Sequence, residues 1–348
     1  MRPRITFNAL ALRPGGSGVQ TYIRELLRQL AGTMDCALFA AVQDDVVGDL
    51  PPGIAPLVRR RADGVSRAVA GARDLGPADL VHGLDVDLPR RRRSPTVATI
   101  HDLSVFDVPW SNSRVRARGE RLLVTASARR ADALIVMSHF TAERVKARFG
   151  RDSVVIPLAP RTDLVPAPGE TVQAVRTRYG LADRFVLHVG NIEPRKDVPA
   201  LAAACREAGV PLVLAGARRD TTVPIPPEAR ALGYVPAGHL AGLYRAATVV
   251  CYPSLYEGFG LPPVEAMACG AAVVATRIPA LAEILGEGAE LVGPGDVAHL
   301  ARTVRELFDD EERRLALAAA GQRQVRHLSW RATAAATTAV YRSIGLRV

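Results

Sequence analysis

Short apolar runs alternate with longer amphipathic stretches along nearly the whole chain. This alternation predicts buried parallel strands joined by helices, which is the pattern of a doubly wound α/β fold. The strands expected in the first half are residues 5–9, 37–41, 80–82, 97–100, 134–137 and 154–156. Residues 19–30 are expected to form a helix, and a later helix, capped by Ser138 or Thr141, should stop at Gly150.

A polar segment with several prolines, residues 157–172, interrupts this pattern and is typical of an interdomain linker. The alternation then restarts, with strands expected at 185–189, 212–215, 249–252 and 272–275 and a helix at 201–208. After Asp296 the pattern is wholly helical.

We therefore expect two Rossmann-like domains, residues 1–165 and 166–329, with a C-terminal helix, residues 330–346, packing back on the first domain. In doubly wound sheets, ligands bind beyond the carboxyl ends of the strands. With two such domains facing each other, the predicted site lies in a central cleft between them.

The formal net charge is +10, and most of it falls in the first half of the chain. Lys146 and Lys196 are the only lysines, so the composition indicates a GC-rich genome in which arginine is the default cation, and we expect a bacterial source. The positive charge indicates solvated loops, or else an acidic acceptor or an anionic membrane surface. An arginine-rich, partly amphipathic stretch near residues 114–124 leaves the lipid alternative open. Nucleic acid is not an expected partner, because no aromatic residues interleave with the arginines.

The chain has no apolar run of the length that spans a bilayer, and its first residues lack the layout of a signal peptide. Its 4 cysteines lie far apart and form no metal-binding pattern, which is typical of reduced residues. We expect a cytoplasmic protein, and its basic surface leaves open a peripheral contact with the inner face of the membrane.

The motif with the most chemical content begins at Glu257 and runs through Gly258, Phe259 and Gly260 to Glu265. The glycines let the backbone approach a bulky polar ligand, and prolines after Leu261 suit the first turn of a helix. Backbone N–H groups from Gly258 to Leu261 are suited to a sugar or its phosphate. Glu265 is expected in that first helical turn, ionised, where it would accept hydrogen bonds from ribose hydroxyls.

A second motif follows the strand that ends near Gly190, where a tight loop carries Arg195 and Lys196 side by side. In a chain that has replaced almost every lysine, Lys196 indicates a role that needs a compact ammonium group. Contact with a diphosphate fits such a point charge.

Together the two motifs resemble the retaining glycosyltransferases of family 4, the group 1 glycosyltransferases, which have the two-domain GT-B fold. The resemblance covers nearly the whole chain. It implies that Glu265 holds the ribose of a nucleoside-diphosphate sugar, that Glu257 contacts hydroxyls of the transferred sugar, and that Lys196 neutralises the diphosphate. Many members have a second cation where this chain has Asn191, and Arg195 is expected to replace it.

The resemblance extends to further positions. Val235 is expected to meet the nucleotide base through its main chain, and the glycine turn at Gly16 and Gly18 to close on the donor phosphate. His101, just past a buried strand, corresponds to a histidine that touches the transferred sugar. The expected donor-binding residues are Gly16, Gly18, Asn191, Arg195, Lys196, Val235, Glu257, Gly258, Phe259, Gly260, Leu261 and Glu265. The expected catalytic residues are His101, Arg195, Lys196 and Glu257.

Other residues leave alternatives open. His82 ends a neighbouring strand and either leans into the same cleft or is structural, and Asp102 either orients His101 or caps a loop. Asp85 and Asp87 match a three-residue metal-binding pattern, but such matches are common by chance, and no metal or other cofactor is expected. The nucleotide sugar is a co-substrate.

The predicted reaction moves a sugar from a nucleoside-diphosphate sugar to a hydroxyl acceptor without a metal. The resemblance implies retention of configuration, by front-face substitution in which the leaving phosphate takes the proton of the acceptor. The acceptor is a small molecule, a glycan or a lipid-linked sugar. Two alternatives are a nucleotide-sugar 2-epimerase, which would need acid and base groups around the sugar, and a non-catalytic protein that binds sugar nucleotides.

Overall fold

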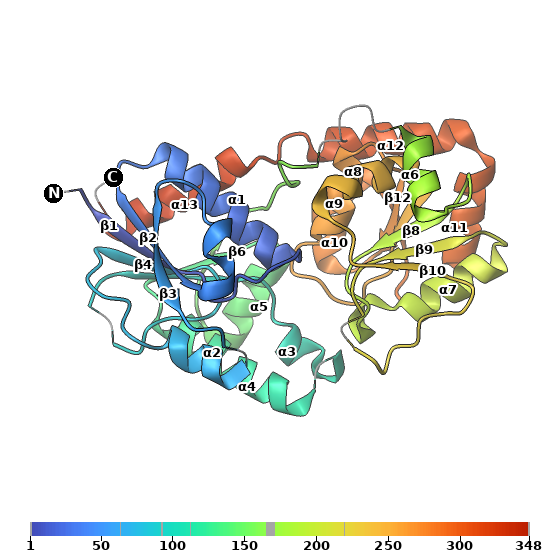
Figure 1. Ribbon diagram of the computed structural model, residues 1–348. Coiled ribbons are helices and arrows are strands. Elements are labelled where there is room, and N and C mark those ends of the chain that lie inside the picture. Colours follow the sequence, from blue (N-terminus) through green and yellow to red (C-terminus); the bar gives the residue numbers. More distant parts are fainter. Residues whose placement is uncertain are drawn as a thin grey trace. The chain divides into compact units, whose positions relative to one another are not determined.

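The computed structural model describes residues 2–346 apart from residues 63, 92, 112, 165–170 and 219. The chain divides into two compact units (Figure 1): Met1–Leu158 with Ser329–Val348, and Ala159–Leu328. The boundary expected between residues 165 and 166 lies outside the described residues. Each unit has its own parallel sheet covered by helices.

Within the described residues, the first unit has a seven-stranded parallel sheet in the order β3-β2-β1-β4-β5-β6-β7. Its strands are β1 (Arg4–Asn8), β2 (Ala37–Gln43), β3 (Ile54–Arg59), β4 (Leu80–Gly83), β5 (Thr96–Ile100), β6 (Ala133–Val136) and β7 (Val154–Val155). The strands near the centre are almost entirely buried, which explains their apolar sequences.

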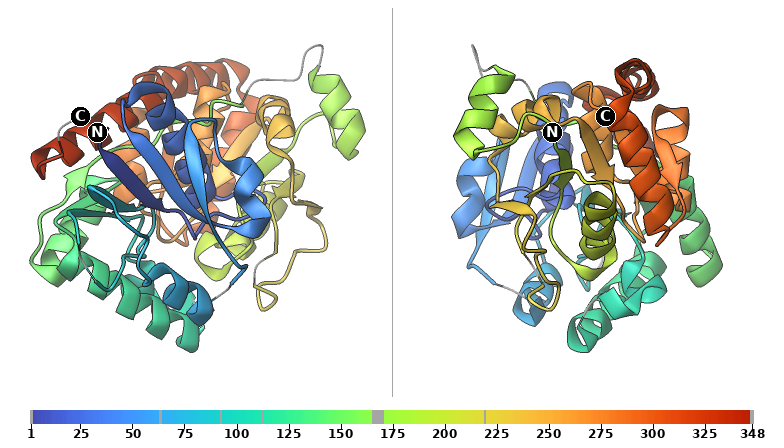
Figure 2. Two further views of the ribbon diagram at one scale, coloured as in Figure 1. Left: turned by 60° about the vertical axis from the view of Figure 1, so that its left-hand side comes forward. Right: turned by 90° about the vertical axis from the view of Figure 1, so that its right-hand side faces the viewer.

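The helices of this unit are α1 (Gly18–Thr33), α2 (Gly64–Gly71), α3 (Ser104–Asp107), α4 (Arg114–Arg130), α5 (His139–Phe149) and α13 (Trp330–Ser343), with short 3₁₀ turns η1 (Asp44–Asp49) and η2 (Pro109–Ser111). Ser138 caps α5 by accepting a hydrogen bond from the Thr141 N–H group, and Gly150 ends it in the left-handed conformation. The C-terminal helix α13 lies beside α1 (Figure 2), where Trp330 packs near Tyr22.

The second unit has a six-stranded parallel sheet in the order β10-β9-β8-β11-β12-β13. Its strands are β8 (Val186–Val189), β9 (Leu212–Ala215), β10 (Arg230–Gly233), β11 (Val249–Tyr252), β12 (Val273–Thr276) and β13 (Glu290–Val292). Its helices are α6 (Val172–Tyr179), α7 (Val198–Glu207), α8 (Ala237–Ala246), α9 (Leu261–Ala268), α10 (Pro279–Leu285), α11 (Val297–Asp309) and α12 (Glu311–Val325), with 3₁₀ turns η3 (Pro194–Lys196) and η4 (Gly286–Gly288).

An aliphatic core fills the space between this second sheet and helices α7 and α11. Leu300, Val304 and Leu307 recur at helical spacing along α11 and are buried. Burying each such side chain contributes roughly 1.5–3 kcal/mol, so packing of this face holds the helix in place. The expected doubly wound α/β class is confirmed for both units.

Candidate functional site

The order of strands in the second unit reverses between β8 and β11, which are neighbours in the sheet although β9 and β10 lie between them in sequence. At such a switch point the connections leave in opposite directions, and ligands of doubly wound folds bind beyond the strand ends. The two motifs found in the sequence follow these two strands. The loop after β8 carries Arg195 and Lys196, and the loop after β11 carries Glu257.

The backbone of the loop after β8 lies unusually close to the backbone that follows β9. A Cβ atom at Gly216, which follows β9, would lie 1.9 Å from the carbonyl oxygen of Gly190 at the end of β8. No side chain fits there, so glycine is required by the approach of the two loops. Asp197, between η3 and α7, has a φ of 45°, and among the described residues it alone is a non-glycine with positive φ. Such strain is common where function fixes the backbone.

The two motifs meet through their charged side chains. Lys196 donates through Nζ to Glu257 Oε1 and to the hydroxyl of Tyr252, the latter at 2.5 Å. Arg195 Nη1 lies 3.1 Å from Glu257 Oε2, and its Nη2 lies 2.8 Å from a carboxylate oxygen of Glu193. Three of the expected catalytic residues, Arg195, Lys196 and Glu257, therefore form one cluster.

Burial and charge both act on the ionisation of this cluster. Burial alone would raise the pKa of Glu257, but Lys196 and Arg195 outweigh it and hold the pKa at about 2. Burial and the neighbouring Arg195 lower the pKa of Lys196, against the opposing effect of Glu257. Glu257 is thus a carboxylate at neutral pH, and its charge is compensated by two cations.

An aromatic layer lies directly beneath the cluster. The Tyr252 ring stacks on His188 with centroids 5.8 Å apart, and Lys196 Nζ lies 4.7 Å from the centroid of the Tyr252 ring. The Nδ1 atom of His188 lies 3.1 Å from the carbonyl oxygen of Cys251, so Nδ1 carries the proton. Neither aromatic residue was predicted as part of the site, although each falls in an expected strand, because apolar strands usually bury such rings for packing alone.

Glu265 differs from expectation. Gly260 is the N-cap of α9, so the helix begins at Leu261 and Glu265 falls beyond its first turn. The prediction that the helix start keeps Glu265 ionised is therefore wrong: burial raises the pKa of Glu265 to about 8, against the opposing charge of Arg161. Its Oε2 accepts a hydrogen bond from Tyr244 at 3.4 Å. Its Oε1 is buried and has no hydrogen-bond partner among the described residues.

Arg161 is a residue that sequence analysis did not select. Its guanidinium group is held by Asp163 through two hydrogen bonds of 2.9 Å, and its charge acts on Glu265 and Tyr234. Tyr234 is exposed, whereas Val235 beside it is buried. The segment expected to meet the base and the glutamate expected to hold the ribose thus share one cationic neighbour.

The remaining expected donor residues of this unit are placed by the same loops. Asn191 directly follows Gly190, and the bend at Gly260 packs on Leu281, where a Cβ atom would lie 2.3 Å from the leucine side chain. Phe259 and Leu261 are buried, so their side chains support the loop and its backbone carries the polar groups.

In the first unit, the glycine turn precedes α1, which begins at Gly18. Ser17 is the N-cap, but its side chain does not cap the helix. Arg24 draws the loop carbonyls toward itself, with hydrogen bonds of 2.7 Å to Arg13 and 2.9 Å to Gly15. Gly16 and Gly18 are exposed.

His101 follows β5 and is partly buried, with its ring edge-on to Tyr22 at 5.0 Å. Its Nε2 lies 3.0 Å from the carbonyl oxygen of Leu84, so Nε2 carries a proton and donates it to that oxygen. Asp102 accepts a hydrogen bond from the Ser104 N–H group at 2.8 Å and therefore caps the loop, which was one of its two predicted roles.

His82 is a core residue, so the alternative that it leans into a cleft is wrong. Both ring nitrogens are hydrogen-bonded within the core, Nδ1 to Tyr341 at 2.7 Å and Nε2 to Thr99 at 2.9 Å. Thr99 also bonds the hydroxyl of Tyr22 at 2.9 Å. Burial lowers the pKa of His82 to about 3, so the ring is neutral and joins α13 to the sheet and to α1.

The acidic pair that matches a metal-binding pattern is engaged with an arginine. Arg67 Nη1 lies 2.6 Å from an Asp87 oxygen and 3.5 Å from an Asp85 oxygen. Among the described residues, no group of three or more His, Cys, Asp or Glu side chains is arranged to hold a metal ion.

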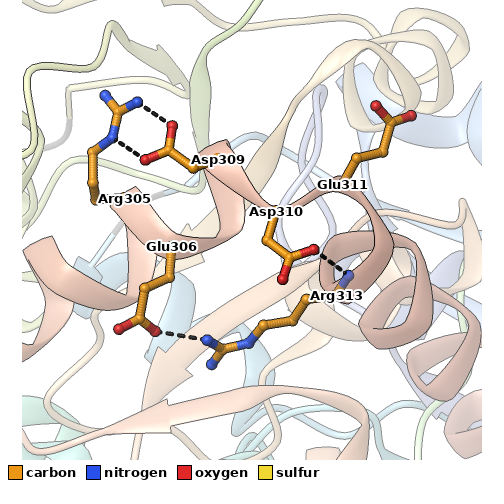
Figure 3. Close-up of a pocket in the computed structure, with 6 residues that line it drawn as sticks. All are labelled: Arg305, Glu306, Asp309, Asp310, Glu311 and Arg313. Atoms are coloured by element: carbon orange, nitrogen blue, oxygen red, sulfur yellow. Dashed lines mark hydrogen bonds and ion pairs between the residues drawn. The ribbon is translucent and has the colours of Figure 1, made fainter.

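An open surface pocket at the corner between α11 and α12 is also made of paired charges (Figure 3). Arg305 binds Asp309 at 2.7 Å, and Arg313 binds Glu306 at 2.7 Å. Asp310 accepts a hydrogen bond from the Arg313 N–H group at 2.9 Å and so caps α12. These residues stabilise the corner and include none of the expected site residues.

Comparison with known proteins identifies the family of the chain. The family described as glycosyl transferases group 1 matches residues 176–324, and the family described as glycosyltransferase family 4 matches residues 16–163. The O-antigen chain mannosyltransferase B of Escherichia coli is 31% identical over 270 residues, which are 72% of this chain and 71% of that protein. The chain belongs to the group 1 glycosyltransferases of family 4. It is a glycosyltransferase that takes its sugar from a nucleotide sugar.

Two further likenesses differ in extent, one covering part of the chain and the other nearly all of it. The MMP α-(1→4)-mannosyltransferase of Mycolicibacterium hassiacum is 46% identical to this glycosyltransferase over 113 residues, which are 31% of this chain and 28% of that protein. Anabaena HepE, solved in complex with UDP-glucose, superposes with a TM-score of 0.77 at 19% identity and covers 98% of this chain and 100% of its own. The expected GT-B fold is confirmed. No helix within the described ranges is long and apolar enough to cross a membrane.

Proposed function

We propose that this glycosyltransferase transfers a mannosyl unit from a nucleoside-diphosphate sugar to a hydroxyl acceptor, with retention of configuration and without a metal ion. The observation that carries the proposal is the convergence of Lys196, Arg195 and Glu257 at the switch point of the second sheet. Two adjacent cations suit a diphosphate, and a carboxylate beside them suits the hydroxyls of the sugar. The choice of mannose is supported by relatives named as mannosyltransferases.

In the proposed reaction the cations stabilise the negative charge that develops on the leaving diphosphate. Front-face substitution lets the leaving phosphate take the proton of the acceptor hydroxyl, so no protein nucleophile is required. We assign Glu265 and its unpartnered Oε1 to the donor ribose, and the main chain of Val235 to the base. His101 assists by hydrogen bonding and is not the base.

The first test is thermal stabilisation of the protein by UDP, GDP, ADP and dTDP, each with manganese and with a chelator. We expect one nucleotide to raise the melting temperature equally in both conditions, and the shift to disappear in Lys196→Ala and Glu265→Ala. Lys146→Ala is the matched control, because this lysine is exposed on α5 and paired only with Asp152, at 2.8 Å, in the described chain. A shift that requires manganese would refute metal independence, and no shift with any nucleotide would refute the assigned donor site.

The sugar and the stereochemistry need a second assay. Mannosyl, glucosyl and N-acetylglucosaminyl donors of the selected nucleotide are supplied with hydroxyl acceptors, and the anomeric configuration of the product is read by NMR. We expect α-linked product from an α-linked mannosyl donor. A β-linked product would refute retention, and faster turnover with another sugar would refute the choice of mannose.

A further inference from the structure

Two cations and two carboxylates form the charged cluster at the ends of β8 and β11. Lys196 and Arg195 both contact Glu257, and Arg195 also pairs with Glu193. Two positive and two negative formal charges cancel, so these four side chains together carry no net charge. A diphosphate brought to the two cations therefore meets Glu257, which already occupies hydrogen-bonding positions on both.

Glu257 is held firmly in this position. Its side chain is 9% exposed, and the Lys196 ammonium group that donates to it also donates to the Tyr252 hydroxyl at 2.5 Å. The stack of Tyr252 on His188 fixes that hydroxyl in turn. A buried carboxylate has little water to screen it, so a second anion nearby costs free energy unless new donors compensate Glu257.

The proposed donor and its product differ in the charges and hydrogen-bond donors that they bring to Glu257. The inference drawn from this difference rests on the proposed function. In the nucleotide sugar each phosphate carries one negative charge, and the sugar brings hydroxyls that can donate to the carboxylate. In the released nucleoside diphosphate the terminal phosphate ionises a second time, with a pKa near ~6, and the hydroxyls are gone. The product has more negative charge and fewer donors than the substrate.

We propose that Glu257 discriminates the sugar-bearing donor from the nucleoside diphosphate product, by repelling a bare diphosphate at Lys196 and Arg195 and accepting hydrogen bonds from the sugar. Glu257 then lowers affinity for the product more than affinity for the donor, which favours product release. In this role Glu257 is a specificity-determining residue as well as a contact of the transferred sugar. Tyr252 is a positioning residue, because it acts through Lys196, which binds both the Tyr252 hydroxyl and Glu257.

The test is Glu257→Gln, which keeps an oxygen acceptor and removes the charge. Dissociation constants for the nucleoside diphosphate selected above and for its intact sugar nucleotide are measured by calorimetry, with circular dichroism to verify folding. Since a like-charge contact is removed, we expect the nucleoside diphosphate to bind about tenfold more tightly or better. The intact sugar nucleotide should gain less affinity than the nucleoside diphosphate, or lose affinity, and turnover should fall.

Glu193→Gln is the matched control, because it removes the same charge from the same cluster but contacts Arg195 alone among the cluster's cations. It should tighten binding of both donor and product, and it should change the ratio of their dissociation constants less than Glu257→Gln does, because Glu193 does not contact Lys196. Tyr252→Phe keeps the ring and every charge but removes the hydroxyl. The ratio should move in the direction seen for Glu257→Gln, by about two- to fivefold, since one hydrogen bond is lost.

If folded Glu257→Gln binds the nucleoside diphosphate no more tightly than the wild type, the inference is overturned. It is also overturned if Glu193→Gln changes the ratio of product to donor dissociation constants as much as Glu257→Gln does. If Glu257→Gln does not fold, the decision rests on Tyr252→Phe, and an unaltered ratio there overturns the inference. These outcomes are distinct from failure of the proposed function, in which neither the wild type nor any variant binds a nucleotide.

Discussion

The buried carboxyl group of Glu265 should make the stability of the protein depend on pH in a way that one substitution removes. Burial raises the pKa of Glu265 to about 8, whereas the ordinary pKa of an exposed glutamate is 4.5. Between these two pKa values the folded chain keeps the proton on Glu265, whereas the unfolded chain has lost it. The stabilising contribution is fully present below the unfolded pKa and is lost as the pH rises through the folded pKa.

The size of the effect follows from the two pKa values. One pKa unit corresponds to about 1.4 kcal/mol, so the wild type should lose about 4 kcal/mol of unfolding free energy from this group between pH 5 and pH 9. Glu265→Gln has no proton to lose and should escape that part of the decline. Urea unfolding followed by far-ultraviolet circular dichroism at several pH values measures the difference between the two proteins.

Glu257→Gln is the control for this experiment, because the pKa of that glutamate is shifted the other way, to about 2. The stability that ionised Glu257 contributes is present above the unfolded pKa and is lost only as the pH falls through about 2. The difference in unfolding free energy between Glu257→Gln and the wild type should therefore be constant between pH 5 and pH 9. Parallel curves for wild type and Glu265→Gln over that range would refute the reasoning about burial of Glu265.

Four further outcomes are expected. Nucleotide binding at pH 7 should release protons, because ribose hydroxyls donate to ionised Glu265, and calorimetry in buffers of different ionisation enthalpy should detect this release in wild type but not in Glu265→Gln. Gly216→Ala should destabilise the second unit by about 3 kcal/mol or more in urea unfolding, because its Cβ atom would lie 1.9 Å from the Gly190 carbonyl oxygen. Tyr341→Phe should cost about 1–3 kcal/mol of stability, because it leaves His82 Nδ1 buried without its partner, and an unchanged melting temperature would contradict this. Sedimentation with anionic liposomes at low salt tests the membrane alternative for α4, where Leu122 is 67% exposed; binding should weaken in Leu122→Ser, and no binding by the wild type would refute membrane contact.

The interior of both sheets was predictable from the sequence, whereas three of the four edge strands, β3, β10 and β13, were not. The strands β8, β9 and β11 are buried on both faces, so each is a continuous apolar run that the sequence displays directly. The edge strand β10 is mostly exposed and has no such run. The edge strand β3 was missed for the same reason, since Ile54 is its only buried residue.

The candidate site divides in a similar way. The residue types of Lys196 and Glu257 suggested their chemistry, but their contact joins positions 61 residues apart, and only the reversal of strand order brings them together. The ionisation of Glu265 was predicted wrongly because it depends on where α9 begins and on how deeply the side chain is buried. Arg161 was missed because, in a chain with so many arginines, one in a linker carries no distinguishing pattern.

The return of α13 to the first unit also bears on how the protein is made. The second unit, Ala159–Leu328, is continuous in sequence, whereas the first needs Ser329–Val348 to complete its core. During synthesis, Tyr22 and His82 emerge long before Trp330 and Tyr341, the aromatic residues that pack against them. The second unit is therefore free to fold first on the ribosome, while the earlier-made half keeps an incomplete core until the last helix arrives. Expression of the isolated N-terminal half should accordingly depend on supplying this helix, as a fused or separate peptide.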